Sequence, residues 1–246
     1  MDRERVVKTV YFDVAKPASP EMFQTPRDDV YRTQQPVVRD VAGARAALEQ
    51  AGYTLGGDGI YVERTGRRLA MTVKVVAGYT DYIQALQLFQ GQLRDAGIAL
   101  DVQQVSSAQF GSDRATGDFQ LLIDGLGGLP DPYSLYKQLL WSGNSAPVGR
   151  RVASNYSRFS DPAVDAALAS IEGTEDEQAR TRFTHQISRV VLDELPLIPL
   201  YQNSPNTTFL ATKVTGWPTD DNRYAVPRAD LYPDTGIIGK IVVPVR

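Results

Sequence analysis

His185 is the main candidate for a catalytic base, because the sequence contains one histidine and no cysteine. A serine hydrolase needs a base beside its nucleophile and a third group that orients the base. His185 falls in a predicted helix over residues 175–194, off the centre of the apolar stripe and near Arg182 and Arg189. That position is typical of a surface or boundary histidine, and no nucleophile-elbow motif is present. We therefore expect no catalytic residues and no enzyme activity.

Two acidic motifs suggest further chemistry, and each has a simpler interpretation. Asp234-Thr235-Gly236 matches the tripeptide of aspartic proteases, a reaction that needs two carboxylates sharing a proton. A single copy would require a symmetric dimer, so we interpret the tripeptide as a turn. Glu175-Asp176-Glu177 stands at the start of a helix, where carboxylates complement the helix macrodipole. Without a histidine–carboxylate spacing for a transition metal, we expect no metal and no cofactor.

A glycine-rich loop at residues 125–130 is the strongest local candidate for a ligand site. It follows a nearly continuous apolar run, Phe119–Ile123, and precedes Asp131 and Pro132, which form a strong helix start. Backbone N–H groups in such a loop can approach a ligand closely. The loop matches neither Walker A nor GxGxxG, so nucleotide binding is unsupported. On spacing alone, a structural turn and a ligand loop are equally open.

Aromatic side chains cluster near this loop in the sequence. Rings with polar tips suit a binding cleft, and they also suit ordinary half-buried positions. Both interpretations stay open for Tyr133, Tyr136, Trp141, Tyr156 and Phe159.

The elements that must position the loop are those of an α/β layer. Residues 60–76 predict a hairpin, and its second strand, Leu69–Val76, alternates so as to bury one face. Alternating strands and helices favour parallel pairings, in a mixed, partly parallel sheet flanked by helices. After the hairpin we expect a helix from Thr80 or Asp81 to Gly97, a strand over 98–102, a short helix near 107–113 and a strand over 119–123.

Other elements follow from capping residues and apolar periodicity. A strand is expected at Leu197–Tyr201, after Pro196 ends the preceding helix. Beyond residue 202 the chain reads as irregular, apart from an apolar stretch at Ile237–Val243. Further helices are expected at 2–13, from the Asp40 cap to Gln50 with Gly52 as the stop, from Asp131 to Trp141, from Ser160 or Asp161, and from a Thr174/Glu177 capping box to Glu194.

Composition limits the class of protein. The chain has 246 residues with 42% apolar and 22% charged side chains, which are ordinary values for a globular protein. A formal net charge of -3 gives no reason to expect binding to nucleic acid or to an anionic membrane. No apolar run is long enough to suggest a membrane span, and no charged-then-apolar leader opens the sequence.

Six motifs in a fixed order resemble the oligopeptide/dipeptide-binding family of ABC-importer receptors, the extracellular solute-binding proteins of family 5. The segments that carry the resemblance are Asp2–Val7, Ala44–Tyr53, Leu86–Leu100, Gly117–Phe119 with Asp131-Pro132, Ser160–Asp165 and Leu192–Tyr201.

The resemblance implies a receptor whose two lobes close on a solute by hinge motion. Residues 1–201 would be the C-terminal ligand-binding lobe, and residues 202–246 a tail that returns to an N-terminal lobe, which this chain lacks. The partners implied are a solute and an ABC permease, and the place implied is extracytoplasmic, periplasmic or at the cell surface, with lipid anchoring in the parent protein.

Two departures from the family bear on the ligand. Members carry a tryptophan after the glycine that follows the third strand, where this chain has Leu126. Peptide binders place an aspartate shortly after that tryptophan, where this chain has Gly127 and Gly128. That aspartate holds a peptide amino group by a charge-assisted bond. We therefore expect a peptide without a free amino group or an oligosaccharide; a receptor-like cell-envelope lipoprotein that acts through protein partners is the alternative. The ligand-binding residues we expect are Leu126, Gly127, Gly128, Asp131, Tyr133, Asn155 and Tyr156.

Overall fold

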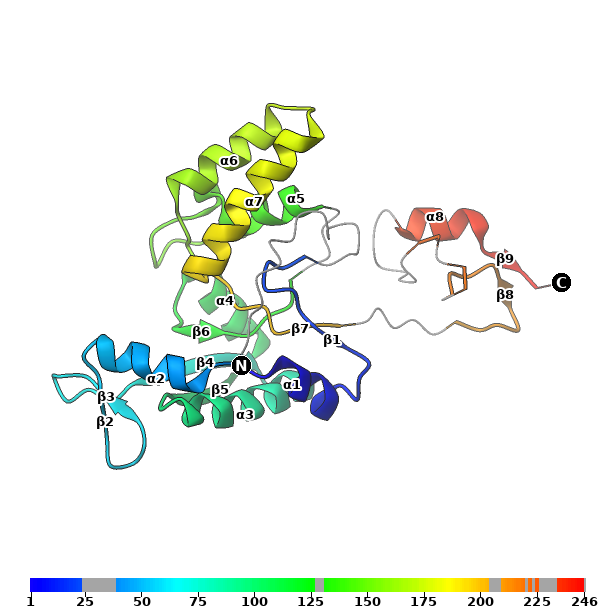
Figure 1. Cartoon of the computed structure of the whole chain (residues 1–246). Helices are drawn as coiled ribbons and strands as arrows, with labels where there is room; N and C mark the ends of the chain where they lie inside the picture. The colour runs from blue at the N-terminus through cyan, green and yellow to red at the C-terminus, as the bar shows by residue number, and fades with distance from the viewer. Residues whose placement is uncertain are drawn as a thin grey trace.

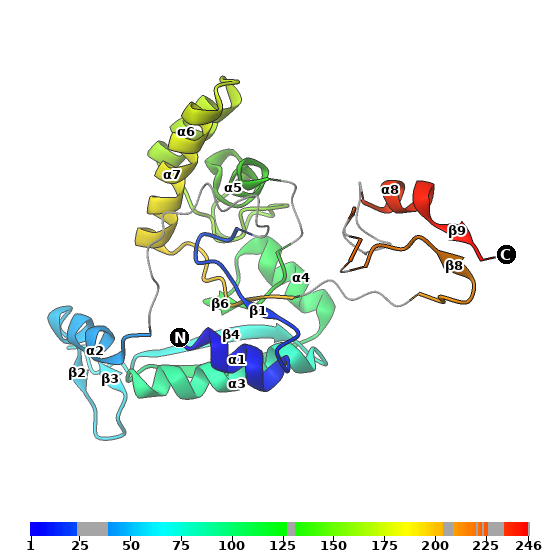
Figure 2. The ribbon, with the colours of Figure 1, turned by 45° about the vertical axis from the view of Figure 1, so that its right-hand side comes forward.

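The computed structural model describes residues 1–23, 39–126, 131–203, 209–219, 221–222, 224–225 and 234–245. In Figures 1 and 2, a small parallel sheet has α1 and α3 on one side and α4 to α7 on the other, and the segment with α8, β8 and β9 lies apart from this body. The arrangement confirms the predicted α/β layer.

The central sheet has the strand order β5-β4-β6, and both pairings are parallel. Its strands are β4 (Ala70–Val76), β5 (Ala99–Val105) and β6 (Leu121–Leu122). The prediction of a strand over 119–123 was too long. Among the described strands, β6 pairs with β4 alone. Just before β6, the Thr72 N–H donates to the Gln120 side chain at 2.7 Å and not to a strand carbonyl.

Helix α3 (Thr80–Asp95) covers one face of the sheet, as its apolar stripe predicts. Val73 and Val75 from the central strand pack with Leu86 of α3 in one core cluster. Helix α1 (Arg3–Val10) packs in turn on α3 through Val6 and Phe89. The Asp2 side chain caps α1 by accepting from the Arg5 N–H at 2.9 Å. The helix ends at Val10 and is therefore shorter than the predicted 2–13.

Helix α4 (Ser107–Thr116) packs against the opposite, polar face of the sheet. Lys74 of β4 points to this face, and its Nζ lies 2.8 Å from the Asp113 carboxylate of α4. The Lys74 side chain is 16% exposed and that of Asp113 5%, so this ion pair is largely buried. Ser106 caps the helix, which begins at the predicted residue 107 and runs past the predicted 113 to Thr116, where Gly117 ends it at φ +80°.

Helices α5 (Pro132–Leu140), α6 (Pro162–Glu172) and α7 (Glu177–Glu194) form a separate helical unit around a large apolar core. Asp131 caps α5 as predicted, and Asp161, one of the two residues predicted to begin the next helix, caps α6. The predicted Thr174/Glu177 capping box was wrong. Asp176 caps α7 through the Gln178 N–H, and the Thr174 hydroxyl accepts from the Asp176 N–H instead.

Helix α2 (Val41–Gln50) begins at the predicted Asp40 cap, and Gly52 follows it at φ +89°. A two-stranded hairpin comes next, formed by β2 (Thr54–Leu55) and β3 (Tyr61–Val62). The predicted hairpin over 60–76 is reduced to a single bridge between Val62 and Arg68, because β4 pairs with β5 and β6 in the parallel sheet.

Segments distant in sequence meet where β1 (Lys16–Pro17) pairs antiparallel with β7 (Tyr201–Gln202). The strand predicted at 197–201 therefore begins only at its last residue. The segment beyond 202 contains β8 (Val214–Thr215), α8 (Asp234–Ile241) and β9 (Val243–Pro244). The Asp234 tripeptide is the first turn of α8, which corrects the prediction of an isolated turn in an irregular tail. None of the described helices is long and apolar enough to cross a membrane.

Candidate functional site

The carboxyl ends of the parallel strands carry a group of aromatic and polar side chains. Tyr79 follows the central strand β4, and Asp124, Gly125 and Leu126 follow β6. Ligands of open α/β sheets bind outside these strand ends. We call this group, together with Tyr82 of α3, the carboxyl edge.

Tyr79 and Tyr82 form the outer part of a chain of tyrosine rings. Tyr79 is 50% exposed, and its ring meets that of Tyr82 edge-on, with the centroids 5.8 Å apart. The Tyr82 ring continues edge-on to Tyr201 at 6.2 Å, and Tyr201 contacts Tyr11 at 4.3 Å. Three segments distant in sequence thus supply one continuous aromatic ladder, exposed only at its outer end.

The inner rings of the ladder are held by polar bonds as well as by packing. The Tyr11 hydroxyl donates to the Asp81 carboxylate at 3.2 Å. Burial raises the pKa of Tyr11, and burial together with a hydrogen bond to Tyr11 raises the pKa of Tyr201. Both hydroxyls therefore stay protonated at physiological pH.

The loop after β6 lies directly against the ladder. A Cβ atom at Gly125 would stand 3.3 Å from the Tyr82 hydroxyl oxygen, so glycine permits this close approach. The pKa of Tyr82 is raised by burial and then by the charge of Asp124, which places that carboxylate nearby. Leu126, the predicted contact in this loop, is 40% exposed.

Asp124 is neutralised within the chain. Its Oδ2 accepts from Arg114 of α4, and its Oδ1 accepts from the Gly125 N–H at 2.8 Å. The Arg114 guanidinium lies over the Tyr156 ring at 4.6 Å from its centroid. Burial lowers the pKa of Arg114, but the hydrogen bond to Asp124 and the charges of Asp124 and Tyr156 together raise it above its usual value, so the guanidinium stays charged. The predicted ligand residue Tyr156 thereby joins the carboxyl edge through Arg114.

Asn155 is completely buried, with 0% of its surface exposed. Its Nδ2 donates to the carbonyls of Trp141 and Phe159 at 3.0 and 2.9 Å. Its Oδ1 accepts from the Phe159 N–H at 3.0 Å and from the Ser157 hydroxyl at 3.2 Å. All the bonds that an amide side chain can make are used here. We therefore assign Asn155 a structural role in place of the predicted ligand contact.

Asp131 and Tyr133 are also engaged within the helical unit. Asp131 accepts from both the N–H and the hydroxyl of Ser134, at 2.9 and 2.8 Å, as a helix cap. The Tyr133 hydroxyl accepts from Lys137 at 2.9 Å, and Lys137 also bonds Glu172 of α6. Asp131 and Tyr133 therefore make contacts within α5 and α6. Gly127 and Gly128, the remaining predicted residues, lie outside the described residues.

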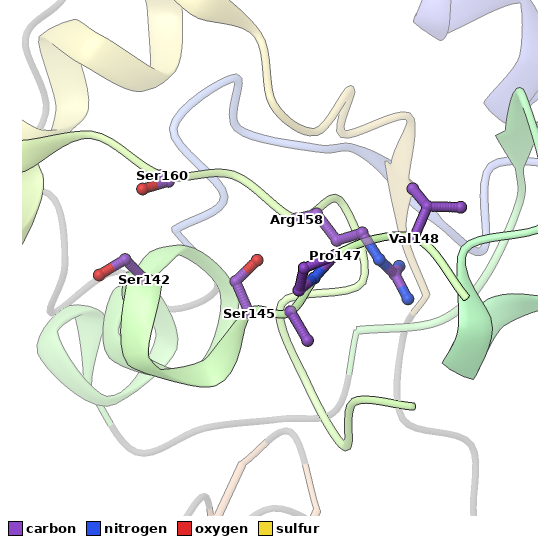
Figure 3. Close-up of a pocket in the computed structure, with 7 residues that line it drawn as sticks. Ser142, Ser145, Pro147, Val148, Arg158 and Ser160 are labelled. Carbon is purple, nitrogen blue, oxygen red and sulfur yellow. The ribbon is translucent and has the colours of Figure 1, made fainter. Parts of the chain in front are cut away.

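A hollow of about 470 Å³ opens beside the short helix η2 (Ser142–Asn144). Figure 3 shows its lining, which comes entirely from residues 142–160 and includes Ser145, Ser160 and Arg158. The Arg158 guanidinium donates to the backbone carbonyls of Tyr156 and Ala115 at 3.0 and 2.9 Å, which fixes the loop to the end of α4. The hollow contains none of the predicted ligand residues.

Two side chains of the carboxyl edge, Tyr79 and Tyr82, were missed by sequence reasoning. The available signal was the residue before α3: Tyr79 occupies its N-cap position and makes no side-chain capping bond. Asp, Asn, Ser and Thr are strongly preferred at that position. Among the described residues, no group of histidine, aspartate and glutamate could hold a metal ion.

Comparison with known proteins points to one family. A model of the bacterial extracellular solute-binding proteins, family 5 Middle, matches residues 1–147. An uncharacterized protein of Sinorhizobium fredii, y4wM, is 26% identical over 206 residues, covering 80% of this chain and 28% of that protein. A putative binding protein of Brucella melitensis is 26% identical over 184 residues, covering 71% and 29%. The chain thus spans less than a third of these relatives.

Solved structures share the fold over nearly the whole chain. The periplasmic oligopeptide-binding protein of a Thermotoga maritima oligopeptide ABC transporter superposes with a TM-score of 0.86 at 19% identity, covering 100% of this chain and 48% of that one. The same protein with bound mannohexaose gives 0.81 at 20% identity, covering 99% and 47%. The oligopeptide-binding protein AppA of Bacillus subtilis, in complex with a nonapeptide, gives 0.72 at 19% identity, covering 100% and 46%.

Proposed function

Because the chain belongs to the bacterial extracellular solute-binding proteins of family 5, we propose that it supplies one wall of a solute site in an ABC-importer receptor, and that it catalyses no reaction. The observation that carries this proposal is the carboxyl edge. It combines exposed apolar and aromatic surface with a glycine loop that lies close to the Tyr82 hydroxyl. Both stand at the strand ends where α/β folds bind ligands.

The class of solute is a peptide or an oligosaccharide. Proteins with the same fold have been crystallised with mannohexaose and with a nonapeptide, which supports both classes. The place of action is extracytoplasmic, and the partner is an ABC permease, in line with the family. Lipid anchoring of the parent protein belongs to the same proposal.

The proposed division is a ligand-binding lobe at residues 1–201 and a tail at 202–246 that packs on a second lobe. Large apolar side chains that stay exposed in the tail support it, because such surface normally marks an interaction site. Leu210 is 61% exposed and Val243 is 50% exposed. The others among the described tail residues are Phe209, Ile237, Ile241 and Val245.

Calorimetric titration with three solute sets tests the receptor function: free peptides, end-blocked peptides and neutral hexasaccharides. The chain, and the longer protein if it is part of one, should bind at least one set. Leu126→Ala should weaken that binding about fivefold, since it removes buried apolar contact. Leu55→Ala is the matched control, because Leu55 is 51% exposed on the β2–β3 hairpin and should leave affinity unchanged.

Two results would contradict the proposal. Binding to none of the three sets would exclude the transport-receptor function and favour an envelope protein that acts through protein partners. Equal effects of Leu126→Ala and Leu55→Ala would place the solute away from the carboxyl edge.

A further inference from the structure

We propose that the carboxyl edge is built for a neutral oligosaccharide, with Tyr79 as the ring on which a sugar stacks and the Tyr82 hydroxyl as a hydrogen-bond partner for it. The inference rests on the proposed solute-binding function and names the ligand class for the same surface.

Tyr79 occupies a position where local stability favours a different residue. Its backbone angles, φ -79° and ψ 76°, are close to those of the capping Asp2, φ -86° and ψ 92°. Asp2 bonds an N–H of its helix, and Tyr79 bonds none. A capping residue here would stabilise α3 by about 1 kcal/mol. A position that gives up local stability to expose an aromatic ring is typical of a functional site.

The ladder behind Tyr79 holds its neighbour in place before any ligand arrives. Tyr82 is half-buried, and its ring packs edge-on against both Tyr79 and Tyr201. The inner end is fixed by the Tyr11 bond to Asp81. A preorganised aromatic surface binds with little loss of side-chain entropy. A sugar ring offers such a surface a face of polarised C–H groups, which the electron-rich face of an aromatic ring attracts.

The hydroxyl of Tyr82 is available to a polar ligand. It makes no hydrogen bond within the part of the chain that the structure describes, although it stands beside Gly125. A phenol hydroxyl can both donate and accept, as sugar hydroxyls do. The surface therefore pairs the stacking face of Tyr79 with the free hydroxyl of Tyr82, which matches the two kinds of group on a sugar.

The Asp124 carboxylate beside Tyr82 already has a cationic partner, which favours sugars over free peptides. Asp124 is bonded to Arg114 and to the Gly125 N–H, while the Asp81 carboxylate accepts from the Tyr11 hydroxyl at the inner end of the ladder. Residues 125–130 contain no charged side chain. A free peptide brings an ammonium and a carboxylate, and leaving such a group without a partner opposes binding. A neutral oligosaccharide brings neither.

The test is calorimetry on the full chain, and on the longer protein if it is part of one, with linear mannohexaose, cellohexaose and maltohexaose. At least one hexasaccharide should bind. Tyr79→Ala should weaken it about tenfold or more, and Tyr79→Phe should keep the affinity within about twofold because it keeps the ring. Tyr82→Phe should weaken it about fivefold, because it removes one neutral hydrogen bond. Leu55→Ala remains the control for exposed apolar surface.

Each outcome decides between the two proposals. Peptide binding without hexasaccharide binding would overturn the ligand class and leave the receptor function standing. Hexasaccharide binding that Tyr79→Ala leaves unchanged would overturn the stacking role. Binding to no peptide and no sugar would overturn both proposals. Circular dichroism of each variant shows that a loss of binding is not a loss of folding.

Discussion

The loop at residues 142–160 and the carboxyl edge look alike in residue type and differ in how their polar atoms are used. In the loop, Asn155 makes four hydrogen bonds and Arg158 donates to three backbone carbonyls. At the carboxyl edge, the Tyr82 hydroxyl has no partner in the described chain, and Tyr79 leaves the N-terminus of α3 uncapped.

This difference separates a polar cluster that holds the fold from one that can take a ligand. A saturated, buried amide stabilises its loop and offers a ligand nothing, whereas an exposed ring and an unbonded hydroxyl contribute little to folding. Substitutions in the loop should therefore change stability, and substitutions at the carboxyl edge should change binding.

The largest effect on stability is expected for Asn155→Ala. The change leaves the carbonyl and the N–H of Phe159 without their partner in a buried site, and it removes one of the two donors to the Trp141 carbonyl. It also puts alanine at φ +44°, in the left-handed region. We expect the free energy of unfolding to fall by about 3–5 kcal/mol. Urea denaturation at an unchanged m-value measures the loss.

The control for this prediction is Tyr156→Phe, the adjacent residue. It removes one exposed hydrogen bond to the Ala153 carbonyl and should lower stability by less than about 1 kcal/mol. If Asn155→Ala were as mild as Tyr156→Phe, the assignment of the loop to folding would be wrong.

Arg158→Met should have the next largest effect. The guanidinium donates to the carbonyls of Tyr156, Ala115 and Arg150 at 3.0, 2.9 and 3.2 Å, so methionine leaves these oxygens without that donor. We expect a loss of about 2–3 kcal/mol in urea denaturation. Arg67→Met is the matched control, because Arg67 is 78% exposed in its pair with Glu63 and such pairs contribute little. Equal effects of the two variants would remove the distinction between bonded and exposed arginines.

The parts of the fold that could be predicted are those that local sequence determines. Asp40, Asp131 and Asp161 each cap the helix that was expected to follow, because the capping carboxylate and the N–H that donates to it lie within a few residues. The apolar alternation of the central strand likewise predicted a buried face, which Val73 and Val75 form.

The parts that could not be predicted depend on residues distant in the chain. Asn155 was predicted as a ligand contact from its loop position and from the order of the family motifs, and only its bonds to Trp141 and Phe159 show that it is saturated. Tyr79 and Tyr82 were missed because their ladder needs Tyr201 and Tyr11, which β7 and the end of α1 bring beside α3.

Arg114→Met tests whether the carboxyl edge is neutral by internal pairing. The Arg114 and Asp124 side chains are 31% and 30% exposed, so losing their ion pair should lower stability by about 1 kcal/mol or less. The change frees the Asp124 carboxylate beside Tyr82, which should raise affinity for free peptide amines about fivefold at low salt. The double variant Arg114→Met, Asp124→Asn should abolish that gain. If the single and the double variant both bind peptide amines as the unchanged chain does, Asp124 does not face the ligand.

The smallest expected change in stability is that of Tyr79→Ser, and its direction, an increase, is the most informative. Because the backbone at Tyr79 resembles that of the capping Asp2, a serine hydroxyl there can accept from an N–H of the first turn of α3. We expect an increase of about 0.5–1 kcal/mol in the free energy of unfolding. Asp2→Ala should change it by a similar amount in the opposite direction, since it removes the bond to the Arg5 N–H.

The same Tyr79→Ser variant should bind hexasaccharide more weakly, so stability and affinity should move in opposite directions. This combination is expected only where a residue is kept for its ligand at the expense of the fold. If the serine variant lost stability, Tyr79 would be supporting α3 or the ladder through its ring. The carboxyl edge would then resemble the 142–160 loop, as a surface whose aromatic residues serve folding.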